Sequence, residues 1–440
     1  MKAKSVTAGQ ILTVLIERIL PGGLGLAHAA EQTIMVALAS PGDRLRVRID
    51  RVKGSVAFAS IQEIIEPSAD RIEPPCPYFG RCGGCDFQQL SYQAQLGAKV
   101  EIIRDCLHRI AKLEEVPNCE ITPAPHQWGY RSRAQWQYDS EQRRFGYFEP
   151  GSRRVCDVSE CAVLAPELQH QFDDLRQRMA DGLLPDDARY FRAVGGDEGV
   201  AVSPGGKSAT PRAGAVAGAG RLHDIHRSIN GETYSLNADS FFQTNADLLP
   251  KLIDAAIGDA SGCTAVELYC GVGLFTLPLT RQFKQVIAIE ENEAAANFAK
   301  RNLTNARLAN ARIENRAVAQ WFESILPVRR ERGFGSKGRG VRDSSTIESA
   351  VEAGALQASG VTQIDFLLLD PPRVGAESRV VDGILQLRPT RICYVSCDPA
   401  TLARDLRKII AGGYLLDSLA AFDMFPQTHH VETIAKLTAT

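Results

Sequence analysis

The stretch that decides the fold is VELYCGVG at residues 266–273, followed by VIAIE at residues 286–290. The first run ends an apolar strand in a glycine-rich turn, and the second ends the next strand in a carboxylate. Glycines let the backbone approach a ligand at the carboxyl edge of a parallel sheet, and an acidic residue about 20 positions later can accept both ribose hydroxyls. The two runs therefore predict a site for an adenosine-containing cofactor.

The glycine pattern also bears on which cofactor binds. Gly271 and Gly273 form the only Gly-x-Gly of this turn, without the third glycine of a dinucleotide site. A methyl donor has no pyrophosphate to place on a helix N-terminus, so the turn favours S-adenosylmethionine over NAD. A tight turn without a ligand is the alternative for the glycines alone, and Glu290 at the end of the second strand strengthens the cofactor interpretation.

Alternating strands and helices continue around this stretch, from about residue 236 to residue 440. Helical stretches separate four apolar runs, at residues 264–269, 285–289, 364–369 and 391–395. This alternation predicts a Rossmann-like α/β domain over residues 236–440, with a mostly parallel, doubly wound sheet. Two of the strands end in DPPR at residues 370–373 and SCDP at residues 396–399.

Cys397 stands at the end of the last of these strands, before a helix predicted over residues 400–410. A thiol in this place, next to a helix N-terminus that favours its thiolate, is a candidate nucleophile. A buried structural cysteine is the alternative, and Cys393 inside the strand fits that role better.

The N-terminal residues 1–66 predict a small β-barrel. Turn signals separate four β-rich runs, at residues 10–17, 32–38, 43–52 and 55–63. Several short strands at this spacing are typical of a barrel.

Residues 67–235 form a predicted central domain that begins with a proline-rich connector and a cysteine cluster. Apolar residues at helical spacing predict a long helix over residues 91–113, which we expect to pack on the catalytic domain. Residues 126–200 are predicted to be β-rich. The compositions of residues 204–220 and 329–342 cannot bury a core, so we expect two inserts there.

Composition limits the class of protein. The 440 residues include 50 Lys and Arg against 52 Asp and Glu, a net charge of −2, with 7% aromatics. These values exclude a globally basic nucleic-acid coat and a charge-driven disordered chain, so a polyanion has to bind at a local patch. Because neither a secretory signal nor a long apolar run is present, we expect a cytoplasmic protein with no membrane segment.

Eleven cysteines are too many for a reducing compartment to use as disulfides. Cys76, Cys82 and Cys85 share one loop, and Cys161 lies far beyond it. Four thiolates suit either zinc or an iron–sulfur cluster. Zinc usually has two short cysteine pairs, whereas three ligands in one loop and a distant fourth suit a larger object. Cys156 is the rival for the fourth position.

Residues 126–156 contain six Arg, three acidic residues and seven aromatics. Interleaved Arg and aromatic side chains are suited to stacking on unpaired bases and to contacts with phosphates. The alternative is a strand face with aromatics in the core and solvated Arg.

The chain resembles the RNA uracil-5-methyltransferase family over nearly its whole length. YVSCDPATLARDL at residues 394–406 and DMFPQTHHVE at residues 423–432 are similar to the two signature segments of that family. FFQTN at residues 241–245, LYCGVG at 268–273 and DPPR at 370–373 match its other motifs.

The resemblance implies the roles of the site residues. Cys397 would be the nucleophile that adds to carbon 6 of uracil, and Glu432 the base that removes the carbon-5 proton. S-adenosylmethionine would be bound by Gln243, Tyr269, Glu290 and Asp370.

The resemblance also implies a second cofactor and a substrate. The cysteine segment is similar to that of [4Fe-4S]-binding members, whose ligands correspond here to Cys76, Cys82, Cys85 and Cys161. The N-terminal barrel resembles the TRAM domain, an RNA-binding module of OB-like fold, so the resemblance implies that fold for residues 1–66. Members with both features generally act on large-subunit (23S) ribosomal RNA, whereas transfer-RNA enzymes typically lack both. We therefore expect a monomeric ribosomal-RNA methyltransferase.

Three alternatives remain open. The first is a transfer-RNA 5-methyluridine methyltransferase. The second is a 5-methylcytidine methyltransferase, although those families carry a different pair of catalytic cysteines. The third is a noncatalytic iron–sulfur RNA-binding protein, which the pairing of Cys397 with Glu432 disfavours.

Two residues depart from the family pattern. Leu274 stands where many members have a polar residue, which would weaken a hydrogen bond to the cofactor. Asp398 replaces the commoner Asn after the nucleophile. A carboxylate there would raise the thiol pKa, and we expect Asp398 to cap the following helix instead.

Overall fold

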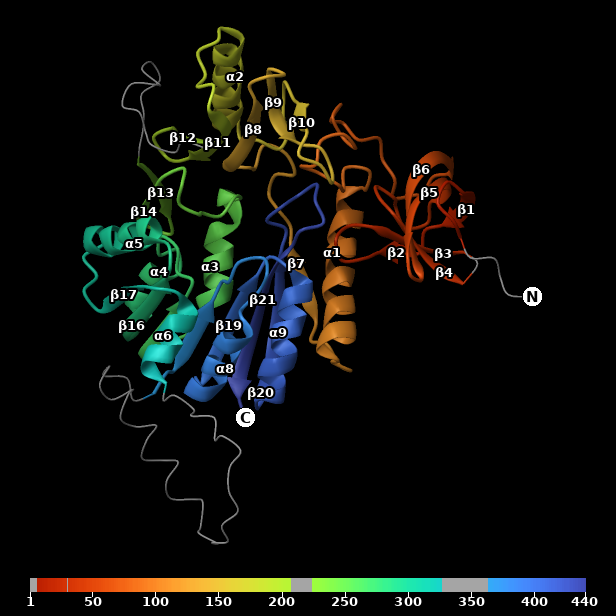
Figure 1. The fold of residues 1–440 in the computed structure, drawn as a ribbon. Coiled ribbons are helices and arrows are strands. Elements are labelled where there is room, and N and C mark those ends of the chain that lie inside the picture. The colour runs from red at the N-terminus through yellow and green to blue at the C-terminus, as the bar shows by residue number, and fades with distance from the viewer. Residues whose placement is uncertain (1–5, 30, 207–223, 327–362) are drawn as a thin grey trace, which may run out of the picture.

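The structure is a computed structural model that describes residues 6–29, 31–206, 224–326 and 363–440. Its C-terminal part is built on an eight-stranded sheet with the order β17-β16-β15-β18-β19-β21-β20-β7 (Figure 1). The strands from β17 to β19 are parallel, while β21 lies antiparallel between β19 and β20. The predicted mostly parallel sheet is therefore confirmed. Its bounds are β15 Gly262–Leu268, β16 Phe283–Glu290, β17 Ala311–Asn315, β18 Phe366–Leu369, β19 Arg391–Ser396, β20 Tyr414–Phe422 and β21 Glu432–Ala439.

Helices cover both faces of this sheet (Figure 1). Side chains of β18 alternate between two cores, with Phe366 and Leu368 on one face and Leu367 and Leu369 on the other. Strands buried on both faces need continuous apolar runs, which is the pattern that the sequence shows. The helices are α3 Leu249–Ile257, α4 Thr276–Gln282, α5 Glu293–Asn305, α6 Val318–Ile325, α8 Ser378–Leu387 and α9 Pro399–Ala411.

Two elements from before residue 236 also belong to this sheet domain. Helix α1, Tyr92–Cys106, begins at the N-cap Ser91, continues into a π-helical turn at Leu107–Ala111 and packs against α9. Strand β7, Cys119–Thr122, pairs in parallel with β20 at the end of the sheet. The helix expected over residues 91–113 is thus present, and β7 is an addition that the sequence did not predict.

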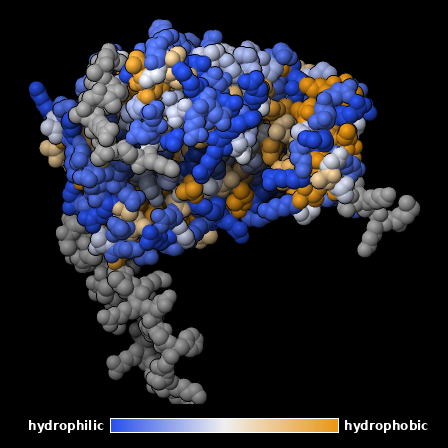
Figure 2. All heavy atoms as spheres, turned by 45° about the horizontal axis from the view of Figure 1, so that its top comes forward, coloured by the Kyte–Doolittle hydropathy of each residue, from blue (hydrophilic) through white to orange (hydrophobic). Residues whose placement is uncertain are grey.

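The N-terminal part is a six-stranded sheet with the order β1-β5-β6-β4-β3-β2. Figure 2 shows apolar side chains gathered over this part of the surface. Ile11 and Leu15 of β1 are exposed hydrophobic residues. The four predicted runs correspond to strands, whereas β2 and β3 were not predicted. Their bounds are β1 Ile11–Leu15, β2 Arg18–Ile19, β3 Gly25–Ala29, β4 Gln32–Val36, β5 Arg44–Lys53 and β6 Val56–Glu66.

The central part contains a five-stranded antiparallel sheet, β10-β9-β8-β11-β12, and a two-stranded sheet, β13-β14. Helix α2, Pro166–Ala180, lies within the region predicted to be β-rich and packs on the first sheet. The predicted insert 204–220 was partly wrong, because residues 204–206 end β12; the rest of it, and the insert 329–342, lie outside the described residues. The strands are β8 Arg133–Asp139, β9 Arg144–Phe148, β10 Val155–Asp157, β11 Ala188–Gly195, β12 Val200–Gly206, β13 Ile225–Ile229 and β14 Glu232–Leu236.

Among the described residues, no helix is both long enough and apolar enough to cross a membrane.

Candidate active site

The predicted site residues lie at one edge of the eight-stranded sheet. Tyr269, Glu290, Asp370 and Cys397 come at or directly after the carboxyl ends of β15, β16, β18 and β19, which are parallel neighbours. Glu432 reaches the same edge from the opposite direction, because it begins the antiparallel strand β21. Carboxyl ends of parallel strands are where ligands bind in open α/β sheets.

Cys397 and Glu432 lie on neighbouring strands. Ser396, the last residue of β19, pairs with Thr433 of the antiparallel strand β21. Cys397 follows Ser396 and Glu432 precedes Thr433, so Cys397 and Glu432 come next to each other at the same end of the two strands. Burial raises the pKa of the Cys397 thiol to about 12, with Glu432 adding to the rise and Arg373 opposing it. The helix N-terminus, which we expected to favour a thiolate, is opposed here by burial and by the neighbouring carboxylates.

Glu432 is 1% exposed, and its Oε1 atom is buried without a hydrogen-bond partner. Burial raises its pKa well above the usual range, Asp370 adds to the rise and Arg373 opposes it. Leaving a buried carboxylate oxygen unpaired costs free energy unless a ligand supplies the partner. Such an atom next to a thiol indicates a site that exchanges protons with a ligand.

Asp398 caps helix α9, as the sequence predicted. Its Oδ1 accepts hydrogen bonds from the backbone N–H groups of Ala400 and Thr401, both at 2.9 Å. The charge of Asp398 nevertheless makes a small contribution to the raised pKa of Cys397. Leu274 is 7% exposed and belongs to the apolar core beside β15, so its side chain has a packing role.

The four predicted cofactor residues form two groups around the glycine turn. The Gln243 side chain donates a hydrogen bond to Asp370 at 3.3 Å, and burial raises the pKa of Asp370. Glu290 accepts hydrogen bonds from the backbone N–H groups of Gly271 at 2.9 Å and Asn292 at 2.8 Å. These bonds orient the Glu290 carboxylate at the end of β16.

Tyr269, the fourth of these residues, lies between β15 and the glycine turn. It takes the left-handed backbone conformation, with φ of 65°, directly before the turn. A non-glycine residue in this conformation is uncommon and is often found at functional sites.

Three further residues of this region had no predicted role. Burial raises the pKa of Glu267 to about 8, and its side chain accepts a hydrogen bond from Thr276. Arg373 is the cation that opposes the raised pKa of both Cys397 and Glu432. Asn245 is fully buried, and neither polar atom of its amide has a partner. A carboxylate inside an apolar strand was a visible signal for Glu267, whereas the isolation of Asn245 required the structure.

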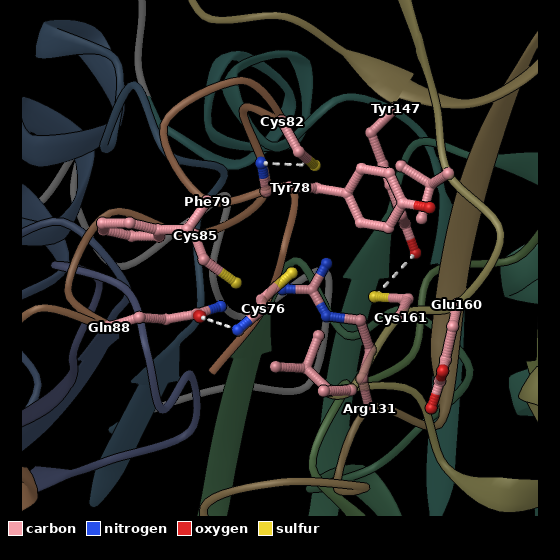
Figure 3. Close-up of a pocket in the computed structure, with 14 residues that line it drawn as sticks. Cys76, Tyr78, Phe79, Cys82, Cys85, Gln88, Arg131, Tyr147, Glu160 and Cys161 are labelled. Carbon is pink, nitrogen blue, oxygen red and sulfur yellow. Dashed lines mark hydrogen bonds between the residues drawn. The ribbon is translucent and has the colours of Figure 1, made fainter. Parts of the chain in front are cut away.

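The cysteines of the predicted cluster line one pocket, with about 440 Å³ of empty space that is partly open to solvent. Figure 3 shows their side chains around it, with the Arg131 guanidinium between them. The lining is mostly apolar and includes Cys76, Cys82, Cys85, Cys161, Tyr78, Phe79, Tyr147 and Val163. Cys156 does not line this pocket and is buried, 3% exposed, in the neighbouring core.

The chemistry of the pocket fits a thiolate-bound group. Burial raises the pKa of Cys82 and of Cys85 to about 12, and Arg131 opposes the rise at Cys85. The Nε atom of Arg131 is buried without a hydrogen-bond partner. A bound metal would deprotonate the thiols, and Arg131 would then face negative charge.

Within the described ranges, no three His, Cys, Asp or Glu side chains are grouped closely enough to hold a metal ion. A single zinc ion requires all four sulfurs about 2.3 Å from one point, whereas a cluster spreads them over several iron atoms. In the part of the chain that the structure describes, the four thiols therefore form no closed site for a single ion.

The predicted Arg–aromatic surface was wrong for most of its aromatics. Tyr130, Trp136, Tyr138 and Phe145 are buried, and most of them form the core between the central sheet and α2. Alternation along β8 and β9 directs these rings inward. Arg143, Arg153 and Arg154 are exposed, although Arg143 donates to the carbonyls of Met179 and Ala180 and Arg154 pairs with Glu149.

Comparisons with known proteins agree with this arrangement. The family described as tRNA (Uracil-5-)-methyltransferase matches residues 225–338 and 355–439, and the TRAM domain matches residues 5–61. An uncharacterized RNA methyltransferase of Streptomyces avermitilis is 31% identical, with 98% of each chain covered. The 23S rRNA (uracil(1939)-C(5))-methyltransferase RlmD of Alkalilimnicola ehrlichii is 30% identical, with 94% of this chain and 93% of the relative covered.

Among solved structures, the chain is similar to the tRNA (uracil-54, C5)-methyltransferase of Pyrococcus abyssi in complex with S-adenosyl-L-homocysteine. The TM-score is 0.68 at 23% identity, and the match covers 97% of this chain and 100% of the other. At this identity the likeness shows the shared fold.

The fold and the sheet edge define an S-adenosylmethionine-dependent RNA methyltransferase with an N-terminal TRAM domain. Its full-length relatives place the chain more narrowly. It belongs to the RNA uracil-5-methyltransferase family, as its sequence motifs predicted.

Proposed function

We propose that this protein transfers the methyl group of S-adenosylmethionine to carbon 5 of a uridine in 23S ribosomal RNA, through a covalent adduct with Cys397. The observation that carries the proposal is the pairing of Cys397 with the buried, unpartnered carboxylate of Glu432 on neighbouring strands. Carbon 5 of uracil is a weak nucleophile and needs a covalent partner at carbon 6.

The first step belongs to Cys397. Its sulfur forms a bond to carbon 6, and the electron pair of the 5,6 double bond moves toward carbon 5 and the carbonyl oxygen. Because burial raises the pKa of this thiol, the thiol gives up its proton to solvent as the sulfur attacks. Arg373 favours that loss, since its charge stabilises the thiolate.

The last step belongs to Glu432. Carbon 5 takes the methyl group from the sulfonium and still carries its hydrogen. Glu432 accepts that hydrogen as a proton, the 5,6 double bond re-forms, and the sulfur of Cys397 leaves carbon 6. A carboxylate with a raised pKa is a stronger base than an exposed one, which suits this step.

Gln243, Tyr269, Glu290 and Asp370 would hold the methyl donor. Glu290 is placed to accept hydrogen bonds from a ribose, as acidic residues at the end of the second strand commonly do. Gln243 and Asp370, already hydrogen-bonded to each other, would meet the methionine and adenosine ends.

Ribosomal RNA is the favoured substrate because full-length relatives are named as 23S rRNA enzymes and because a TRAM domain is present. Transfer RNA is the second candidate, since the matching family is described as acting on it. A cytoplasmic location and a monomeric state belong to the same proposal.

Maps of 5-methyluridine in ribosomal and transfer RNA should distinguish the two substrates. Cells without the protein should lose the modification at one uridine of 23S ribosomal RNA, and the uridine corresponding to position 1939 is the first to examine. Return of the gene should restore it. Loss from transfer RNA alone would assign the second substrate.

We also propose that Cys76, Cys82, Cys85 and Cys161 hold a [4Fe-4S] cluster. Their shared pocket and its mostly apolar lining support it. The cluster would join the loop at residues 76–85 to the strand connection at Cys161. The boundaries proposed for the three domains are 1–66, 67–235 and 236–440, except that α1 and β7 pack into the sheet domain. The first domain is proposed to close as a barrel of OB-like fold, since β1 contacts β3.

Two cysteine variants should separate the fourth ligand from its rival. Anaerobically purified Cys161→Ala should lose most of its iron and its visible absorbance, because Cys161 lines the pocket and Cys156 does not. Cys156→Ala should keep roughly four irons per chain. Iron loss in Cys156→Ala alone would exchange the two assignments, and stoichiometric zinc without iron in the unaltered protein would refute the cluster.

A further inference from the structure

The segment of residues 423–431 connects β20 to Glu432, the proposed base at the start of β21. It contains Gln427 in the left-handed backbone conformation, with φ of 68°. Three successive carbonyls, those of Phe425, Pro426 and Gln427, accept hydrogen bonds from residues that precede the methyltransferase half, residues 236–440. The conformation that leads into Glu432 is therefore determined largely from outside that half.

The cysteine loop, residues 76–87, supplies one set of these contacts. The backbone N–H groups of Asp86 and Phe87 donate to the Gln427 carbonyl at 3.1 and 3.0 Å. The Asp86 carboxylate accepts from the backbone N–H of His429 at 2.8 Å and pairs with the His429 ring through its other oxygen. Asp86 thus holds two positions of the segment shortly before Glu432.

Helix α1 supplies the second set. Lys99 and Asp423 form an ion pair with both side chains 0% exposed, and Lys99 also donates to the Phe425 carbonyl at 3.0 Å. Gln95 exchanges two hydrogen bonds with Gln427, at 3.0 and 2.9 Å. Buried pairs of this kind are costly to break because each break leaves an unpaired group.

Tyr130 completes the frame by donating to the Pro426 carbonyl at 2.9 Å. The segment is thus held on two sides, by α1 with Tyr130 and by the cysteine loop. Among the described residues, the hydrogen bonds to His429 come from the cysteine loop, through Asp86.

We propose that Asp86 is a positioning residue for Glu432, through which the cysteine loop fixes the geometry of the proton-removing base. The proposal rests on the proposed function of Glu432. Cys85, a predicted cluster ligand, directly precedes Asp86, so displacement of the loop moves the contact to His429. Uracil methylation needs no electron transfer. The contact between Asp86 and His429 would give the cysteine pocket a structural role in the reaction, with no redox step.

The position of the contact predicts a selective defect. Cys397 lies between β19 and α9. Among the described residues, no hydrogen bond or ion pair joins Asp86 to either of these two elements. Loss of Asp86 should therefore leave adduct formation and methyl transfer intact and slow only the removal of the carbon-5 proton. A general folding defect would slow all three steps.

The test compares Asp86→Ala with two controls in the full chain. Asp86→Asn retains an oxygen acceptor for the His429 N–H. Asp70→Asn changes a carboxylate that makes no hydrogen bond or ion pair with other described residues. Each protein is mixed with unmodified substrate RNA and methyl-labelled S-adenosylmethionine in a single turnover, and the denaturation-stable, methyl-labelled protein–RNA complex is followed over time.

Asp86→Ala should release its methylated RNA roughly 10- to 100-fold more slowly, the scale expected when a catalytic group is displaced by about an ångström. Asp86→Asn should recover much of the rate, and Asp70→Asn should match the unaltered protein. Release from Asp86→Ala at the unaltered rate would overturn the proposal, as would an equal slowing of adduct formation on 5-fluorouridine RNA. If the unaltered protein forms no adduct with that RNA, the proposed function itself fails.

Discussion

Cys397→Ala should abolish both methylation and the covalent complex with 5-fluorouridine-substituted RNA. The fall in rate should be roughly 10⁴-fold or more, because removal of the nucleophile in covalent enzymes leaves only binding and positioning. Fluorine at carbon 5 cannot leave as a proton, so the normal protein stops at the methylated adduct. Denaturing electrophoresis measures that adduct, and nucleoside analysis measures 5-methyluridine.

Cys393→Ala is the matched control. Cys393 lies on β19, the strand that ends directly before Cys397, is 0% exposed and belongs to the core. It should lower stability while the adduct still forms. A Cys397→Ala protein that still formed the adduct would show that another cysteine is the nucleophile.

The pH profile of adduct formation adds a second measurement. Below its pKa the thiolate fraction of a cysteine grows about tenfold per pH unit, and burial raises the pKa of Cys397 to about 12. Adduct formation should therefore accelerate as pH rises from 6 to 8. A flat profile would mean that bound RNA lowers the thiol pKa below this range.

Glu432→Gln should trap the methylated covalent intermediate on ordinary, unfluorinated RNA. Glutamine has nearly the same shape but cannot accept the carbon-5 proton, so elimination should slow by roughly 10²- to 10⁴-fold, the usual range for general bases. Because Glu432 is buried and makes no hydrogen bond through Oε1, the exchange disturbs few contacts. The mass of the trapped complex should include the transferred methyl group.

The double variant Cys397→Ala with Glu432→Gln is the control, since it should form no complex at all. Rapid release of methylated RNA by Glu432→Gln alone would assign the base to another group. Asp370, whose pKa burial also raises, would then be the next carboxylate to replace.

The methyltransferase sheet was predictable because its strands are buried on both faces and are written as continuous apolar runs. Strands β2 and β3 were missed, since β2 has two residues and β3, GLAHA, has few β-branched or aromatic side chains. Helix α2 was missed although its signals were present, with Pro166 at the first turn and Leu168, Phe172, Leu175 and Met179 at helical spacing.

The chemistry of the site was predictable only to the level of residue identity. Strand ends placed Asp370 and Cys397 at one edge, and the family resemblance added Glu432. Burial decided the rest: it raises the pKa of Cys397, isolates Glu432 Oε1 and turns the predicted stacking surface around Trp136 into core. Such effects depend on neighbours from distant parts of the chain, which local patterns do not contain.

Strand β7 limits how this enzyme can be divided. A fragment that begins at residue 236 would contain every proposed catalytic residue, but it would lack β7 and α1. Strand β20 would then be an unprotected edge strand, and its free N–H and C=O groups would be open to pairing with other chains. We expect such a fragment to aggregate, so the smallest unit expected to fold cleanly includes the segment from residue 91.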